Sequence, residues 1–136
     1  MIIPPLMGLL ILALTTVYGF FVNTFALWMG ARLLALEKRG LKTALLTTSV
    51  YTVIYAMMFS ASFLIGIFSD LLSIILIYAS ILVSTILLIL LIKVFYKIGW
   101  KTALTAWLIV LGANTVIHVL LALALAILTT TVKIIF

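Results

Sequence analysis

The chain contains no cysteine, only two acidic residues and a single histidine among its 136 residues. The absence of cysteine excludes disulfide scaffolds, thiolate metal sites and thiol nucleophiles. Without cysteine, the sequence gives no indication of the redox state of the protein's compartment. Charged residues make up 7% of the chain, whereas a soluble domain carries roughly 25% because its surface must be hydrated. The 68% hydrophobic content excludes a disordered chain, because so apolar a sequence collapses. The composition indicates a folded, very hydrophobic protein with few groups for acid–base chemistry.

The ten charged residues are clustered. One group spans 32–42, a second spans 93–101, and Asp70 and Lys133 stand alone. Each uncharged stretch between them is longer than the roughly 18 apolar residues that suggest a membrane-spanning helix. The two outer stretches could reach about 46 Å, against a hydrocarbon core of about 30 Å, so they tilt, protrude or lie in a medium other than an ordinary bilayer. The four stretches are 1–31, 43–69, 71–92 and 102–132, of 31, 27, 22 and 31 residues.

Runs this long without apolar–polar alternation predict helices, because lipid offers no hydrogen-bond partners to an open strand. Short links make consecutive helices antiparallel neighbours, so we expect a single domain over residues 1–136, an all-α up-down four-helix bundle. In the links, Gly40 is expected at the C′ position of the first helix, Ser69 or Asp70 as the cap of the third, and Gly99 at the turn before the fourth. The expected helices are about 4–36, 42–68, 72–97 and 102–134, with links 37–41, 69–71 and 98–101.

This topology places seven basic residues and Glu37 at one end of the bundle, a net charge of 7 − 1 = +6. In a membrane this end is expected to be cytoplasmic, with both termini outside. No positive segment precedes the first apolar run, so a cleavable signal peptide is not expected. The predicted contacts to anionic headgroups, or to nucleic-acid phosphate in the virion alternative below, are Arg32, Lys38, Arg39, Lys42, Lys93, Lys97 and Lys101. The aromatic residues expected in an interfacial belt at this end are Trp28, Tyr96, Trp100 and Trp107.

An internal repeat occurs at the first and third links. Residues 38–45 read KRGLKTAL and residues 97–104 read KIGWKTAL, with six identities in eight positions. We interpret this as a duplicated helical hairpin, with repeat 1 at about 4–68, repeat 2 at about 72–134 and a pseudo-two-fold along the bundle axis. Thr43 and Thr102 are expected as caps or near-caps. The motif lacks the first glycine, the spacing and the preceding strand of a P-loop, which argues against nucleotide binding.

At this motif the chain resembles small tandem-hairpin membrane proteins of archaea and bacteria. The segment ALWMGARLLALEKRGLKTAL is echoed by IKVFYKIGWKTALTAWL. The resemblance implies a four-helix integral membrane protein, and it implies no activity, so no functional residue is transferred from it. In size and in its lack of polar tails the chain is also loosely similar to the hydrophobic α-helical capsid proteins of archaeal viruses.

The most costly polar side chains inside the apolar runs are two amides and one imidazole. Asn114 and His118 are four residues apart and so share one helix face. Asn23 lies about 13 Å inward from Arg32 and Asn114 about 18 Å inward from Thr102, so the two can meet. We interpret Asn23, Asn114 and His118 as intramembrane contacts, either hydrogen-bonding between helices or forming a proton or substrate path through His118. A metal site is not expected, because one histidine cannot complete a coordination shell.

Clustered carboxylates or a nucleophile with its base are missing, so we expect no enzyme, no catalytic residues and no cofactor. The first hypothesis is a membrane accessory or scaffold subunit that self-associates or joins a larger assembly. The second is a major capsid protein of an archaeal virus, with the basic end facing packaged nucleic acid. The third is a small transporter or channel that uses the Asn/His site.

Overall fold

The described residues form four long helices and no strand, which confirms the predicted all-α, four-helix fold. A computed structural model describes the backbone of residues 5–66 and 68–135, with the side chains of these ranges except residues 5, 6, 8, 9, 63, 66 and 132–135. All four helices are long and apolar enough to cross a membrane. They are α1 (Pro5–Leu33), α2 (Leu41–Gly66), α3 (Asp70–Tyr96) and α4 (Trp100–Ile135).

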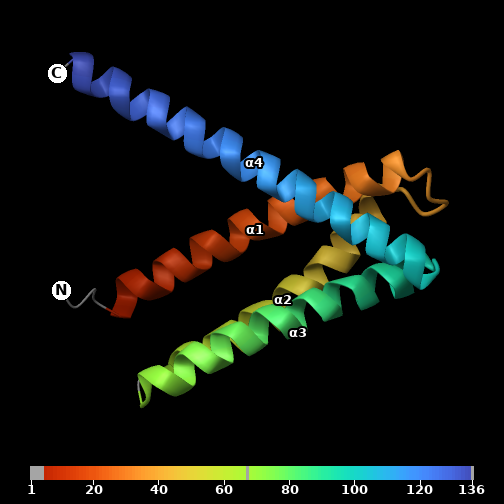
Figure 1. The fold of residues 1–136 in the computed structure, drawn as a ribbon, viewed down its shortest axis with the longest axis horizontal. Coiled ribbons are helices and arrows are strands. Elements are labelled where there is room, and N and C mark those ends of the chain that lie inside the picture. Colours follow the sequence, from red (N-terminus) through yellow and green to blue (C-terminus); the bar gives the residue numbers. More distant parts are fainter. Residues whose placement is uncertain (1–4, 67, 136) are drawn as a thin grey trace.

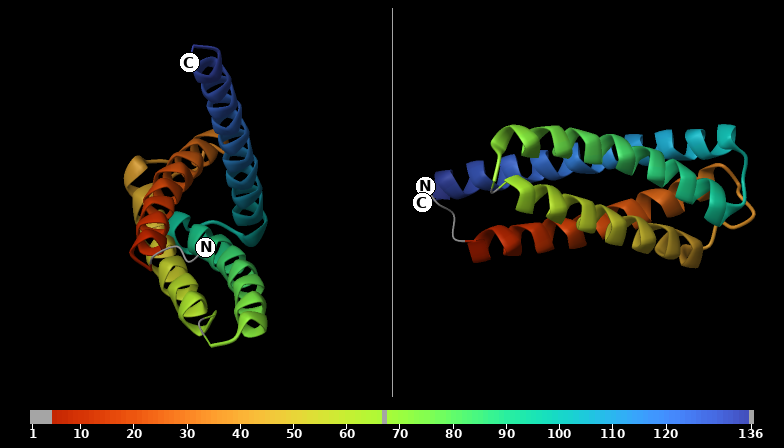
Figure 2. Two further views of the ribbon diagram at one scale, coloured as in Figure 1. Left: turned by 90° about the vertical axis from the view of Figure 1, so that its left-hand side faces the viewer. Right: turned by 90° about the horizontal axis from the view of Figure 1, so that it is seen from below.

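The helices run back and forth along one long axis, and the α1–α2 and α3–α4 links lie at the same end (Figure 2). Each helix contacts two neighbours, because α1 packs on α2 and α4, and α3 packs on α2 and α4. From this shared end the helices spread apart, and α4 diverges from α1 (Figure 1). At about 1.5 Å per residue the 36 residues of α4 reach about 54 Å. Every described side chain from 118 to 131 is exposed, so the second half of α4 projects from the bundle.

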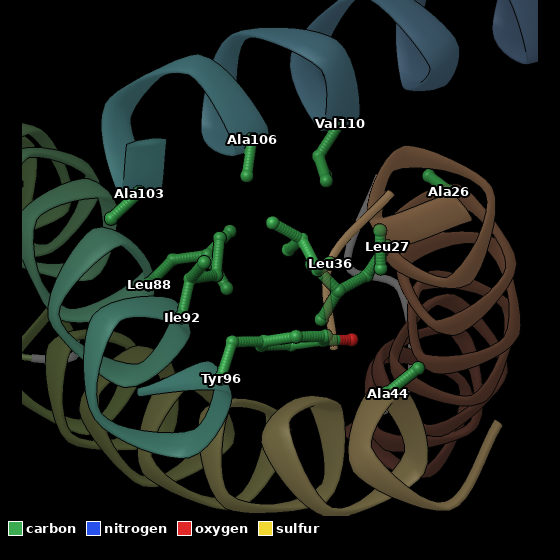
Figure 3. Packing of buried hydrophobic residues seen from close by; sticks show 11 residues of the cluster. Ala26, Leu27, Leu36, Ala44, Leu88, Ile92, Tyr96, Ala103, Ala106 and Val110 are labelled. Carbon is green, nitrogen blue, oxygen red and sulfur yellow. The ribbon is translucent and has the colours of Figure 1, made fainter. Parts of the chain in front are cut away.

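A compact hydrophobic cluster holds the helices together at the end with the two links. In Figure 3 the side chains of Leu88, Ile92 and Tyr96 point from α3 toward Leu27 and Leu36. Five alanines complete the cluster, and small side chains let helix backbones approach closely. These five buried alanines let the helices pack into a core at this end. The cluster residues are Ala26, Leu27, Ala31, Leu36, Ala44, Leu88, Ile92, Tyr96, Ala103, Ala106 and Val110.

The α1–α2 link corrects the expected role of Gly40. Helix α1 ends at Leu33, and the left-handed backbone conformation is taken by Ala35, with φ 50°. The Leu36 amide donates to the Ala31 carbonyl at 3.0 Å and the Ala35 amide donates to the Arg32 carbonyl at 3.1 Å, which is a Schellman motif. Burial of Leu36 against the core anchors this turn. The helix ends before residue 36 because the apolar side chain of Leu36 folds back onto the bundle.

The α3–α4 link ends α3 in the same way. Lys97 has φ 52°, its amide donates to the Val94 carbonyl at 3.3 Å, and the Ile98 amide donates to the Lys93 carbonyl at 3.2 Å. Gly99 lies in this link directly before α4, as predicted, but the left-handed residue that ends α3 is Lys97, and no glycine of the described chain has a positive φ. At the start of α3 the expectation is confirmed for Ser69, whose side chain accepts a hydrogen bond from the Leu72 amide.

The repeated motif has the same local structure in both copies. Gly40 and Gly99 each precede the first helical residue, and each carbonyl accepts from the amide four residues on, at 3.4 Å from Ala44 and 2.9 Å from Ala103. The glycines are thus at the N-cap position, and the threonines expected there are the third helical residues instead. Both alanines are fully buried. Duplication of the hairpin stays a prediction.

Candidate functional site

The seven basic residues predicted as phosphate contacts lie in or beside the two links at the core end. Six of them are exposed and Lys93 is partly buried. They lie here because each Lys or Arg follows or precedes an apolar run that forms a helix. The exposed acid Asp70 begins α3 at the opposite end, and the side chain of Lys133 lies outside the described residues.

Two of the basic side chains stack on tryptophans. The Arg32 guanidinium lies 4.3 Å from the centre of the Trp28 ring, and the Lys93 ammonium lies 5.0 Å from that of Trp100. Such cation–π contacts keep a charge close to apolar surface while its polar atoms reach outward. One contact lies near the end of α1 and the other joins α3 to α4. Together they mark the level at which the surface changes from apolar to basic.

The expected aromatic belt is only partly present. Trp100 is exposed, as a belt residue should be, whereas Tyr96 is 3% exposed and belongs to the core cluster. Trp107 is half-buried and lines an internal cavity. Sequence position alone assigned these rings to the correct end of the bundle. Only the packing shows that Tyr96 and Trp107 face inward rather than toward lipid.

A cavity of about 560 Å³ lies between the four helices, directly beyond the core cluster. Its walls are residues 12–23 of α1, 51–59 of α2, 81–88 of α3 and 107–118 of α4. On α1 and α2 these segments lie further from the basic end than the core residues, whereas Leu88 and Val110 belong both to the cluster and to the lining, so the cavity adjoins the cluster. None of the lining residues is Asp, Glu, Lys or Arg. Among the described residues no group of three His, Asp or Glu side chains could hold a metal ion.

The three polar residues predicted as intramembrane contacts meet at this cavity. The Asn114 side-chain amide donates to the Asn23 side-chain oxygen at 2.7 Å, and this bond joins α4 to α1. The His118 Nδ1 atom lies 2.6 Å from the Asn114 backbone carbonyl. Because a carbonyl only accepts, the ring donates to it through Nδ1, and in the tautomer that carries its proton on Nδ1 the Nε2 atom is an acceptor. The Tyr18 ring packs edge-on against His118 with centroids 5.6 Å apart.

Four of the eight hydroxyl groups that line the cavity are bonded to their own helix. Thr15 and Thr16 donate to α1 carbonyls, and Ser84 and Thr85 both donate to the Ile81 carbonyl. Such bonds satisfy a hydroxyl without a partner helix. By contrast, the Asn114 side-chain oxygen and the Tyr18 hydroxyl are buried without a partner. The buried lining atoms without a partner therefore lie on the α1–α4 wall.

The α2 wall of the cavity, opposite the α1–α4 wall, carries a stack of three aromatic rings, here called the aromatic ladder. It was not predicted from the sequence. The rings of Tyr51, Tyr55 and Phe59 stack along α2, with successive centroids 5.9 and 6.0 Å apart. The signal was present in the sequence, because the three rings are four residues apart and therefore share one helix face.

The Asn23–Asn114 bond gives a measurable coupling between α1 and α4. We expect a double-mutant cycle of Asn23→Leu and Asn114→Leu, measured by unfolding in mixed detergent micelles, to give a coupling energy of about 0.6–2 kcal/mol. The matched control pairs Asn23→Leu with Thr130→Val. Thr130 is exposed on the projecting half of α4, where its hydroxyl bonds only to its own helix. If the coupling energy of the two asparagines is no larger than that of the control pair, the hydrogen bond between them is contradicted.

Comparisons with known proteins add no relative: no family model matches the sequence, and no curated protein and no solved structure matches the chain.

Proposed function

We propose that this protein is a non-enzymatic, multi-pass membrane protein, an accessory or scaffold subunit whose basic end lies among anionic lipid headgroups. The observation that carries the proposal is the polarised surface. The seven basic side chains gather at one end, while large apolar side chains are exposed along all four helices. Hydrocarbon covers such an apolar surface at no cost, and each Lys or Arg near an anionic leaflet contributes about 1 kcal/mol.

The projecting half of α4 supports the association with further chains. It carries Ala122 and Ala126, both exposed, at the four-residue spacing of close helix contacts. The remaining side chains of this segment are exposed as well, so α4 presents a free helix beyond the bundle. A second copy or another membrane helix packs there in the proposed assembly.

Single cysteines test the orientation, because the chain has no cysteine of its own. We place Glu37→Cys in the α1–α2 link and Phe68→Cys in the α2–α3 link, both at exposed positions. A membrane-impermeant maleimide added to intact cells should label the cysteine at 68 and should reach that at 37 only after lysis, because basic links stay cytoplasmic. Labelling of both sites, or of the site at 37 alone, in intact cells would refute this orientation.

A third position in the same experiment reports on association. Ala126→Cys should be joined to a neighbouring copy by a bifunctional maleimide, whereas Ala79→Cys, exposed on α3, serves as the control and should remain monomeric. If Ala126→Cys and Ala79→Cys cross-link equally, α4 is not the contact surface.

The length of α4 favours one second function. Its reach of about 54 Å exceeds a hydrocarbon core of about 30 Å, and a capsid shell does not impose that limit. In a virion the same basic end would contact nucleic-acid phosphates. Recovery of the protein in a regular lattice with nucleic acid against Lys38, Lys97 and Lys101, rather than in the membrane fraction, would favour this function over the first.

A further inference from the structure

We infer that the cavity between the four helices is a binding site for a neutral, membrane-soluble ring compound that carries a hydroxyl group. This goes beyond a scaffold role, which needs no cavity. The volume of about 560 Å³ falls within the roughly 300–1,000 Å³ of small-molecule sites. Such sites combine mostly apolar walls with a few convergent polar groups, and this cavity has the same composition.

The lining determines the charge of the ligand. No Asp, Glu, Lys or Arg lines the cavity, so an ion bound there would lack a countercharge. Burying an unpaired charge in a low-dielectric site is costly, which excludes carboxylates, phosphates and ammonium groups. The ligand is therefore uncharged, and an uncharged ligand of this size enters from the surrounding hydrocarbon.

The α1–α4 wall determines the polar group. The Asn23 side-chain nitrogen has no partner in the described chain, because the Asn23 oxygen, not the nitrogen, contacts Asn114. It is also not among the buried unpartnered atoms, so it is an accessible donor. His118 is exposed and offers Nε2 as an acceptor. Asn114 bonds to both residues and so holds this donor and this acceptor on one wall. A hydroxyl accepts one hydrogen bond and donates one, which matches this pair.

The α2 wall determines the body of the ligand. The Tyr51 and Tyr55 rings stack at 24° and the Tyr55 and Phe59 rings at 23°, so the ladder is a continuous aromatic surface. Flat rings pack against such a surface in offset or edge-on geometries that add to the burial of apolar area. A ring on this wall and a hydroxyl on the opposite wall span the cavity between α2 and the α1–α4 pair.

The test uses a matched pair of photoprobes on the full-length protein in neutral-lipid nanodiscs. Hydroxymethyl-benzophenone has the ring and the hydroxyl, and methyl-benzophenone has the ring alone. Mass spectrometry then compares insertion into the cavity segments, 12–23, 51–59, 81–88 and 107–118, with insertion into the projecting segment 119–131. The ratio of cavity insertion to insertion into the projecting segment should be about three- to thirtyfold higher for the hydroxyl probe than for the methyl probe. This is the difference in affinity that one intramembrane hydrogen bond gives. Equal ratios, as for a cavity that holds only water, overturn the inference.

Two glycines supply the blocking variant and its control. A Cβ built on Gly19, which lines the cavity, meets no atom within 4 Å, and the same is true of Gly112, which is exposed outside the cavity. Gly19→Leu should therefore fill the cavity without clashing with the backbone and abolish the hydroxyl-dependent labelling, whereas Gly112→Leu should retain it. Asn23→Leu should equalise the two probes, because it removes the donor to the hydroxyl. Retention of the hydroxyl preference in Gly19→Leu or Asn23→Leu overturns the inference.

Discussion

Replacing Ile92 with alanine is expected to lower the free energy of unfolding by about 2–3 kcal/mol. Ile92 is fully buried and lies in the cluster that all four helices share (Figure 3). Truncating a buried isoleucine in a soluble protein costs about 2–5 kcal/mol, through lost transfer from water and the cavity left behind. In lipid the separated helices remain in hydrocarbon, so the packing and cavity part dominates and the lower part of the range is expected. Unfolding by a denaturing detergent in mixed micelles measures the difference.

Ile86→Ala is the matched control for Ile92→Ala, because Ile86 is on the same helix and 56% exposed. Its truncation removes an exposed side chain and leaves no internal cavity, so the unfolding free energy should change by less than about 0.5 kcal/mol. Equal losses for the two variants would show that Ile92 is not at the centre of the packed cluster.

Gly30→Leu is expected to separate α1 from α4 at their closest approach. A Cβ at residue 30 would lie 3.3 Å from Cγ2 of Ile109 and 4.0 Å from the Ala106 carbonyl oxygen. The rest of a leucine side chain would then meet α4 itself, and overpacking of this kind costs about 1–3 kcal/mol. Detergent-induced unfolding should show a lower midpoint for Gly30→Leu than for the unmodified protein.

Gly112→Leu again provides the control for Gly30→Leu. Leucine is a better helix former than glycine by up to about 1 kcal/mol, so Gly112→Leu, in open space on α4, should be neutral or stabilising. The difference between the two variants therefore isolates the steric effect at the α1–α4 crossing. If Gly30→Leu is as stable as Gly112→Leu, the two helices are not in contact at residue 30.

The number and placement of the helices could be predicted because the charges are scarce and clustered. All but two of the ten charged residues lie in or next to the first and third links, so the apolar runs between the charges coincide with the helices. The predicted helix bounds differ from the observed ones by up to three residues. The largest difference is at the end of α1, where burial of Leu36 folds the chain back before the apolar run ends.

The roles of individual link residues could not be predicted in the same way. Glycine is the usual residue at a left-handed C′ position, yet Ala35 and Lys97 adopt this conformation here. The cost of a positive φ without glycine is about 1–2 kcal/mol per residue. At the first link it is offset by the buried contact of Leu36 at the following position, which depends on the tertiary packing.

The candidate site, too, could be predicted from the sequence only in part. The identity of Asn23, Asn114 and His118 as the costly residues follows from sequence, since polar groups inside apolar runs are few. Sequence spacing also allowed Asn23 and Asn114 to lie at similar depth. The cavity and the aromatic wall of Tyr51, Tyr55 and Phe59 depend on how far the helices diverge beyond the core.

By itself, then, the sequence determined an all-α protein of four long apolar helices and the position of its basic residues beside the links. Those properties are local, because an uncharged run either is or is not long enough to form a spanning helix. Only the tertiary structure decided where the helices close and where they open. Alanines at one end allow backbones to approach, whereas tyrosine, phenylalanine and tryptophan rings further along line a cavity between all four helices. The free half of α4 follows from the same packing, because α4 diverges from α1 beyond the core (Figure 1).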